Sequence, residues 1–110
     1  MPNSSKPTVN FLTERELPPF AISCYEDHVT QVTHWFYRLI SKQAEGTNWS
    51  LVLPSTNKLT KFFGRCRKED VLKSLETLAK RGYDIQKNSG FKPSIVIRPK
   101  QKVPHTQMAH

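Results

Sequence analysis

Cationic side chains crowd the second half of this chain, and the chemistry open to them is the binding of phosphate. Residues 1–57 hold four Lys and Arg against five Asp and Glu, a net charge of −1, whereas residues 58–110 hold thirteen against four, a net charge of +9. A charge that served only solubility would be spread more evenly. Because Lys and Arg attract phosphates and Arg can also bond a guanine edge, the second half is predicted to meet a nucleic acid.

Catalytic and metal chemistry have little support in the sequence. Cys24 and Cys66 lie 42 positions apart and belong to no CxxC or Cys-His cluster, so we interpret them as buried or idle thiols. His28 and His34 are six residues apart, which does not fit the i, i+4 pair of a helical metal site. Paired carboxylates and a glycine-rich phosphate loop are also missing from the sequence. We therefore expect no enzyme activity, no metal and no cofactor.

The length of the chain restricts its organisation. With 110 residues there is room for one domain with a modest core, and none for a separate effector-binding domain, so no small-molecule effector is expected. No apolar run approaches the roughly 18 residues of a membrane span, and the N-terminus lacks a secretory signal. The sequence therefore predicts a cytoplasmic protein without a membrane partner.

The first expected element is an amphipathic helix. Ser23 and Glu26 have the spacing of a capping box, which predicts that the helix begins at Ser23. Apolar residues at helical spacing predict its buried face: Val29, Val32, Trp35, Phe36, Leu39 and Ile40. The helix is expected to end near Glu45–Gly46. The short apolar run from Trp49 to Leu53 then predicts a strand that could join the sheet.

Two further helices and a hairpin follow. Ser55 predicts the cap of a short helix with Leu59, Phe62 and Phe63 on its buried side. A second helix is expected from about Val71, and Gly82 is typical of the residue that closes one. The strands of the hairpin are predicted at 83–87 and 95–97, on either side of a turn at 88–90. The pattern indicates an α+β winged helix-turn-helix with three helices and a small antiparallel sheet.

The ends of the chain are expected to lie outside this domain. Residues 1–19 are rich in Pro, Ser and Thr, which predicts a flexible N-terminal arm, although the arm could still contribute a short strand. Residues 100–110 are polar and without periodicity, which predicts a disordered C-terminal tail. The winged helix domain is therefore assigned to residues 20–99.

The order Leu53-Pro54-Ser55-x-x-x-Leu59-x-x-x-Phe63-Gly64, followed by Val71-x-x-x-Leu75-x-x-Leu78-x-x-x-Gly82, resembles the DNA-binding half of GntR-type winged-helix regulators. The resemblance covers roughly residues 25–98. This chain departs from the family in the turn before Val71, which is one residue longer. It also departs at Leu72, which stands where those regulators commonly have a second arginine that touches DNA.

The resemblance implies a set of DNA-binding residues. It places DNA contacts at Asn57 in the motif's first helix, at Arg67 and Lys68 at the start of the recognition helix, and at Lys87, Asn88 and Lys92 in the wing. Lys58, Lys61, Arg65 and Lys73 would extend the rim that faces the phosphates. Glu69 and Asp70 are interpreted as stabilising the first turn of a helix, with exclusion of wrong DNA sequences as the alternative.

The function expected from these features is sequence-preferring binding to double-stranded DNA. A small transcriptional regulator, such as a repressor, or an accessory protein of a mobile element or phage would fit, and it would be nucleoid-associated when bound. A homodimer on adjacent half-sites is expected, with the first helix or the aromatic-bearing arm as its interface. The alternatives are a winged-helix adaptor that binds an acidic protein within a larger complex, and an RNA-binding module.

Overall fold

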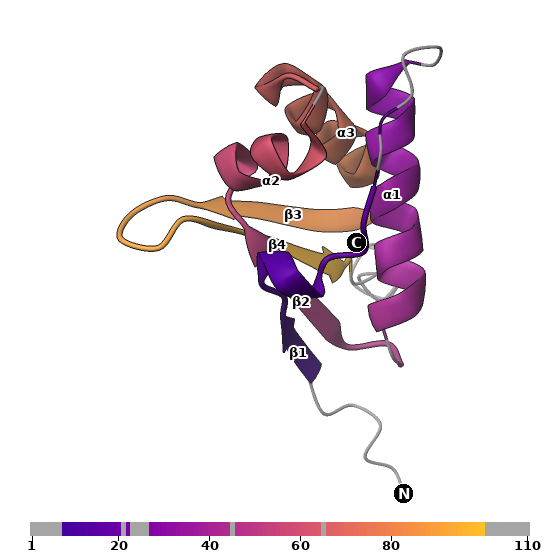
Figure 1. Ribbon diagram of the computed structural model, residues 1–110. Coiled ribbons are helices and arrows are strands. Elements are labelled where there is room, and N and C mark those ends of the chain that lie inside the picture. The colour runs from indigo at the N-terminus through magenta and orange to yellow at the C-terminus, as the bar shows by residue number, and fades with distance from the viewer. Residues whose placement is uncertain (1–7, 21, 23–26, 45, 65, 101–110) are drawn as a thin grey trace, which may run out of the picture.

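The computed structural model of the chain describes residues 8–20, 22, 27–44, 46–64 and 66–100. Within these residues the protein is α+β, with three α-helices and one four-stranded sheet (Figure 1). The helices are α1 (His28–Gln43), α2 (Thr56–Phe63) and α3 (Lys68–Lys80), and a short 3-10 turn, η2, spans Glu14–Glu16. The strands are β1 (Thr8–Phe11), β2 (Trp49–Pro54), β3 (Tyr83–Asn88) and β4 (Ser94–Pro99). The predicted class, α+β with three helices, is confirmed.

The sheet is mixed, whereas the sequence predicted an antiparallel one. Its order is β1-β2-β4-β3, and β4 pairs antiparallel with both β2 and β3, as expected of the hairpin and the Trp49 strand. The difference arises at β1, which pairs parallel with β2, Thr8 beside Trp49. Because the long α1 connection separates β1 from β2, the chain can return to the same end of the sheet, as parallel pairing requires.

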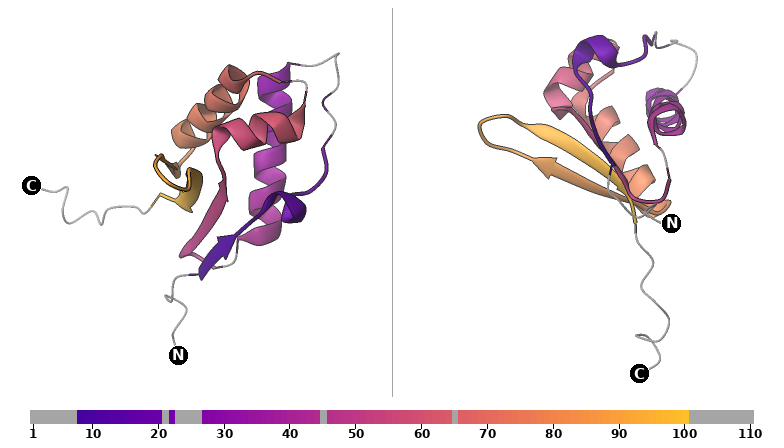
Figure 2. Two further views of the ribbon diagram at one scale, coloured as in Figure 1. Left: turned by 60° about the vertical axis from the view of Figure 1, so that its left-hand side comes forward. Right: turned by 90° about the horizontal axis from the view of Figure 1, so that it is seen from below.

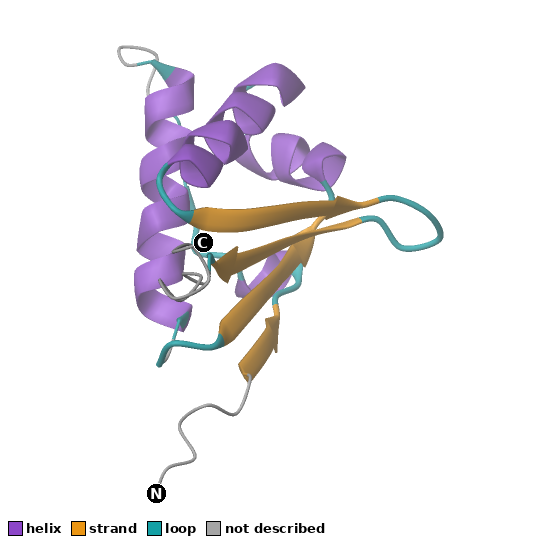
Figure 3. Cartoon of the chain, turned by 180° about the vertical axis from the view of Figure 1, so that it is seen from behind, coloured by secondary structure: helices purple, strands orange, loops and turns teal. Residues whose placement is uncertain are grey.

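One face of the sheet carries the core. Burial alternates along β2 and β4, so that Leu51, Leu53, Ile95 and Ile97 are buried while their neighbours are partly exposed. In the ribbon views the helices are grouped beside the strands, and the hairpin projects away from them (Figures 2 and 3). The hairpin therefore has its tip outside the packed body.

Helix α1 supplies the largest core side chains but begins later than predicted. It starts at His28, and the carboxylate of Asp27 accepts a hydrogen bond from the Thr30 N–H (3.0 Å), so Asp27 is the N-cap. The predicted capping residues, Ser23 and Glu26, lie outside the described residues. The predicted apolar face is otherwise confirmed, because Val32, Trp35, Phe36, Leu39 and Ile40 are buried and only Val29 is half-buried.

The cap of α2 and the end of α3 are confirmed, whereas α3 begins earlier than predicted. The hydroxyl of Ser55 accepts from the Lys58 N–H (3.3 Å), and Leu59 and Phe63 are buried on the inward side of α2. Helix α3 starts three residues before Val71, with Arg67 at the N-cap position. It ends at Lys80, and Gly82 adopts a φ of 105°, a conformation that side chains with a Cβ rarely adopt.

Residues 8–20 differ from the expected flexible arm. After β1, Leu12 and Leu17 are buried in the core, and the Pro18 carbonyl accepts a hydrogen bond from the Trp35 indole N–H (3.1 Å). Phe20 packs edge-on against Phe63, with ring centroids 5.5 Å apart. The average composition of this Pro-rich stretch hides these few anchoring residues, which join the core or contact residues far along the chain. Residues 1–7 and 101–110 lie outside the described part.

Candidate nucleic-acid interface

A hollow of about 370 Å³ lies where the starts of α2 and α3 face the β3–β4 hairpin. We refer to it as the hairpin groove. Its lining comes from Ser55, Thr56 and Asn57 at the start of α2, Lys68 and Leu72 on α3, and Lys87, Asn88, Ser89, Pro93 and Ser94 on the hairpin. Two lysines, two amides and four hydroxyls thus converge there, and none of the lining side chains is acidic.

Helices α2 and α3 both contribute their N-terminal ends to the groove. Thr56 is the first residue of α2 and Lys68 the first of α3, so the N-terminal ends of both helices lie at the groove. The first turn of an α-helix carries N–H groups without an intrahelical partner and a partial positive charge. Together with the ammonium groups of Lys68 and Lys87, this makes the groove favourable to an anion such as phosphate.

The remaining predicted residues are divided among other places. Lys58 and Lys92 line a second hollow of about 570 Å³, together with the acidic Glu14, with Phe11 and Phe91, and with residues of β2. Lys61 and Lys73 are exposed on α2 and α3, and neither lines either hollow. Arg67 is exposed at the N-cap of α3, while Arg65 lies outside the described residues. Of the predicted set, Asn57, Lys68, Lys87 and Asn88 therefore line the hairpin groove, and the other described members do not.

The acidic residues at the start of α3 have separate surroundings. The Asp70 carboxylate accepts a hydrogen bond from the Arg67 N–H (2.9 Å) and lies 3.7 Å from Nδ1 of His28 on α1. Asp70 is therefore engaged with the helix start and α1, which confirms for this residue the interpretation that it stabilises the first turn. Glu69 is exposed and does not line the hairpin groove.

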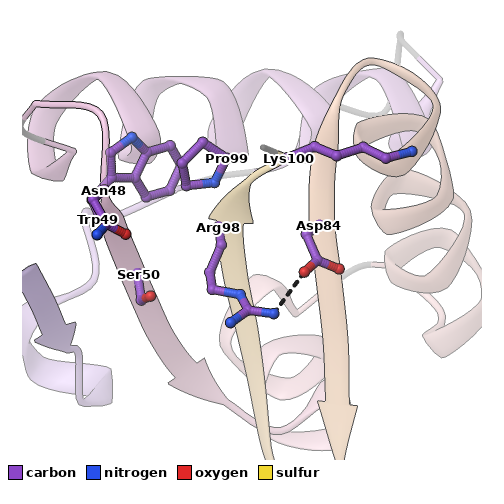
Figure 4. A pocket seen from close by; sticks show the side chains of 7 residues that line it. All are labelled: Asn48, Trp49, Ser50, Asp84, Arg98, Pro99 and Lys100. Carbon is purple, nitrogen blue, oxygen red and sulfur yellow. Dashed lines mark hydrogen bonds and ion pairs between the residues drawn. The ribbon is translucent and has the colours of Figure 1, made fainter. Parts of the chain in front are cut away.

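Another hollow, of about 520 Å³, lies at the Trp49 end of the sheet, and Arg98, one of the two cationic residues that line it beside Lys100, is already paired (Figure 4). Arg98 on β4 donates to Asp84 on β3 across the register position that these residues share, with Nη2 and Oδ2 2.6 Å apart. The two side chains point toward each other in the close-up. Arg98 is therefore a cation whose charge is balanced locally.

This cross-strand pair is expected to contribute little to stability. Both side chains are more than two-fifths exposed (42% and 43%), so water screens their attraction. A double-mutant cycle with Asp84→Ala and Arg98→Ala, followed by urea denaturation, should give a coupling free energy of about 0.2–1 kcal/mol. A coupling above about 2 kcal/mol would mean that the pair is desolvated and would contradict this view of the open hollow.

Sequence reasoning missed two features of the hairpin groove and the hairpin tip. The hydroxyls of Thr56, Ser89 and Ser94 were not expected in the site, because only the folded chain brings the hairpin beside α2. Phe91 was also missed, and its side chain is 97% exposed at the hairpin tip. Its position between Gly90 and the Lys92–Pro93 pair, inside a turn, is the signal that could have drawn attention to an aromatic outside the core.

Other chemistry finds no organised site in the described part of the chain. No group of three or more His, Cys, Asp or Glu there could hold a metal ion. Cys66 is a buried free thiol, and burial, with the nearby Asp70 carboxylate, raises its pKa above the usual value. Such a thiol is a poor nucleophile, in keeping with the interpretation of Cys66 as idle; Cys24 lies outside the described residues.

Comparison of the chain with protein-family models, with curated proteins and with solved structures found no match. Among the described helices, none combines the length and the apolar character needed to cross a bilayer.

Proposed function

We propose that this chain is a winged-helix module, of the GntR-type arrangement, that binds double-stranded DNA. In this proposal α3 enters the major groove by its first turn, and the β3–β4 hairpin acts as the wing that follows the neighbouring backbone. The observation that carries the proposal is the hairpin groove, because Asn57, Lys68, Lys87 and Asn88 come from three elements and converge there without a carboxylate.

The chemistry of the groove fits a nucleic acid better than an acidic protein surface. Ammonium groups and helix N-termini bind phosphates, while Asn side chains can bond both the donor and the acceptor of an adenine edge. The lining hydroxyls add further donors to phosphate oxygens. Such a mixture serves both positioning on the backbone and direct contact with bases.

The outward side of α3 indicates how the helix would be used. Glu69, Lys73, Glu76 and Lys80 are exposed and alternate in sign, with each Glu four residues before a Lys. Such spacing favours a solvated helix surface and gives no net attraction to DNA. The proposal therefore assigns DNA contact to the first turn of α3, around Lys68, and to the hairpin, and leaves the later turns of α3 outside the groove of the duplex.

Sequence-preferring binding suits a small transcriptional regulator or an accessory protein of a mobile element or phage. A single module of this size buries a limited surface on DNA, so we propose that two copies occupy adjacent half-sites. Selection of bound duplexes from a random pool would test both points. A recovered motif with two related half-sites is expected, whereas no enrichment would favour the adaptor alternative.

The salt dependence of binding to duplex DNA tests the core of the proposal. If Lys58, Lys68, Lys87 and Lys92 each neutralise one phosphate, the log–log slope of affinity against salt should be about −3 to −4. Fluorescence anisotropy with a labelled duplex measures this slope, and an unlabelled RNA competitor provides the comparison. Absence of duplex binding at low salt, or stronger competition by RNA than by duplex DNA, would contradict the proposal.

A further inference from the structure

We propose that Phe91 is a wedge that enters the minor groove of the bound duplex, separates two stacked base pairs and bends the DNA. This inference rests on the proposed function, because it assigns a step of duplex recognition to the tip of the hairpin. Proteins that bind the minor groove commonly insert an apolar side chain between base steps and bend the duplex in this way.

The exposure of Phe91 is the first observation behind this inference. Its side chain is 97% exposed, against 70% for Phe11 and 48% for Val9, the other large hydrophobic residues that are exposed in the described part of the chain. An aromatic ring left in water loses the stabilisation that burial would supply. Phe91 therefore contributes almost no buried surface to the fold. Its ring would become buried by contact with the surface of another molecule.

The hairpin presents the ring at its outermost point. Pairing of β3 with β4 extends to Asn88 and Ser94, so Phe91 lies in the middle of the five-residue tip, Ser89–Pro93. The tip turns through Gly90, whose φ of 127° favours glycine. In Figure 1 the two strands run out well past α2, with nothing of the described chain beyond their tip. A projecting turn of this kind can reach a groove that is too narrow for a helix.

Positively charged residues lie on both sides of Phe91 in the sequence, as contact with the phosphates of a duplex requires. Lys92 follows Phe91 directly, and Lys87 stands just before the tip on β3; both are exposed. Their ammonium groups could hold the phosphates that border the minor groove while the ring enters between them. Lys87 also lines the hairpin groove, which joins the site of the wedge to the proposed major-groove contact at Lys68.

The second hollow, beside the tip, allows a different role for the ring of Phe91. Phe91 lines the hollow that Phe11 and β2 share, so the ring could instead be a lid over that apolar surface. At 97% exposure the ring does not cover the hollow in this structure. A lid would make Phe91 contribute to folding stability, whereas a wedge would make it contribute to DNA bending and affinity and not to folding stability. The two roles are separable by experiment.

The test measures bending and unstacking directly. A short duplex with a donor and an acceptor dye at its two ends reports bending by energy transfer, and 2-aminopurine placed at successive steps reports unstacking as a rise in fluorescence. The wild-type protein should bend the duplex by about 20–90° and raise the signal at one or two neighbouring steps. Phe91→Ala should lose both signals and bind about tenfold more weakly, while Phe91→Leu should keep most of the bend.

Matched variants separate the wedge from the proposed function. Phe91→Ala removes no charge, so its salt slope should equal that of the wild type, whereas Lys92→Ala should reduce the slope by about 0.9 and keep the bend. Wild-type binding with the full salt slope but no bend and no unstacking would overturn the wedge alone. Loss of folding stability in Phe91→Ala with an unchanged bend would show the ring to be a lid. No duplex binding by the wild type would overturn the wedge together with the proposed function.

Discussion

Replacing Lys68 and Lys87 together by alanine is expected to weaken duplex binding by about 60-fold at about 0.1 M salt. Both lysines line the hairpin groove, one at the start of α3 and one on β3. If each lysine neutralises one phosphate, losing the pair lowers the magnitude of the log–log salt slope by about 1.8. Over the tenfold difference between 1 M and 0.1 M salt, this change in slope corresponds to a factor of about 60 in affinity. Anisotropy titrations across this salt range measure both the affinity and the slope.

The matched control removes the same charge elsewhere. Lys42 and Lys80 are exposed in the last turns of α1 and α3, and neither lines the hairpin groove. The double variant Lys42→Ala with Lys80→Ala should lose less than about threefold in affinity, since distant exposed charges are largely screened at this ionic strength. Equal losses in the two double variants would show that net charge, and not the groove, determines binding. Such a result would contradict the proposed interface.

Trp35→Ala is expected to lower the free energy of unfolding by about 3–5 kcal/mol. The indole lies at the centre of an aromatic cluster, with ring centroids 4.9 Å from Phe63, 5.3 Å from Phe36 and 5.8 Å from Phe62. Its N–H also donates to the Pro18 carbonyl (3.1 Å), which attaches the N-terminal segment to α1. Because stabilities of domains are about 5–15 kcal/mol, this loss would be a large part of the total.

Urea denaturation followed by circular dichroism measures the effect, and two variants control for it. Trp35→Phe keeps an aromatic ring but not the N–H donor, so its loss should be smaller than that of Trp35→Ala. Phe91→Ala removes an aromatic side chain that is 97% exposed, and should change stability by less than about 0.5 kcal/mol. Similar losses in Trp35→Ala and Phe91→Ala would contradict the assignment of Trp35 to the core.

The effect of Trp35→Ala should extend to the hairpin groove. Phe62 and Phe63 belong to α2, whose first turn lines the groove, and Trp35 packs against both rings. Loss of this support would loosen the position of Asn57 relative to the hairpin, so we expect duplex affinity to fall even where the variant remains folded. The core and the candidate interface are thus linked through one short helix.

Local signals in the sequence were sufficient for α2, α3 and the hairpin. Ser55 caps α2, and Gly82 follows α3 with a positive φ. Each of these signals acts between residues a few positions apart, so the sequence determines it without knowledge of the rest of the fold. The same reasoning placed the start of α1 at Ser23, but Asp27 caps the helix instead.

The sequence by itself determined that cations gather in residues 58–110 and that three helices and a hairpin follow one another in this order. Tertiary structure alone decided that β1 joins the sheet in parallel, and that Lys68 and Lys87 share a groove while Arg98 is paired with Asp84. The physical reason is the range of the interactions. Caps, turns and periodicity act within a few residues, whereas strand pairing and the meeting of a helix with a hairpin depend on contacts between segments that only packing brings together.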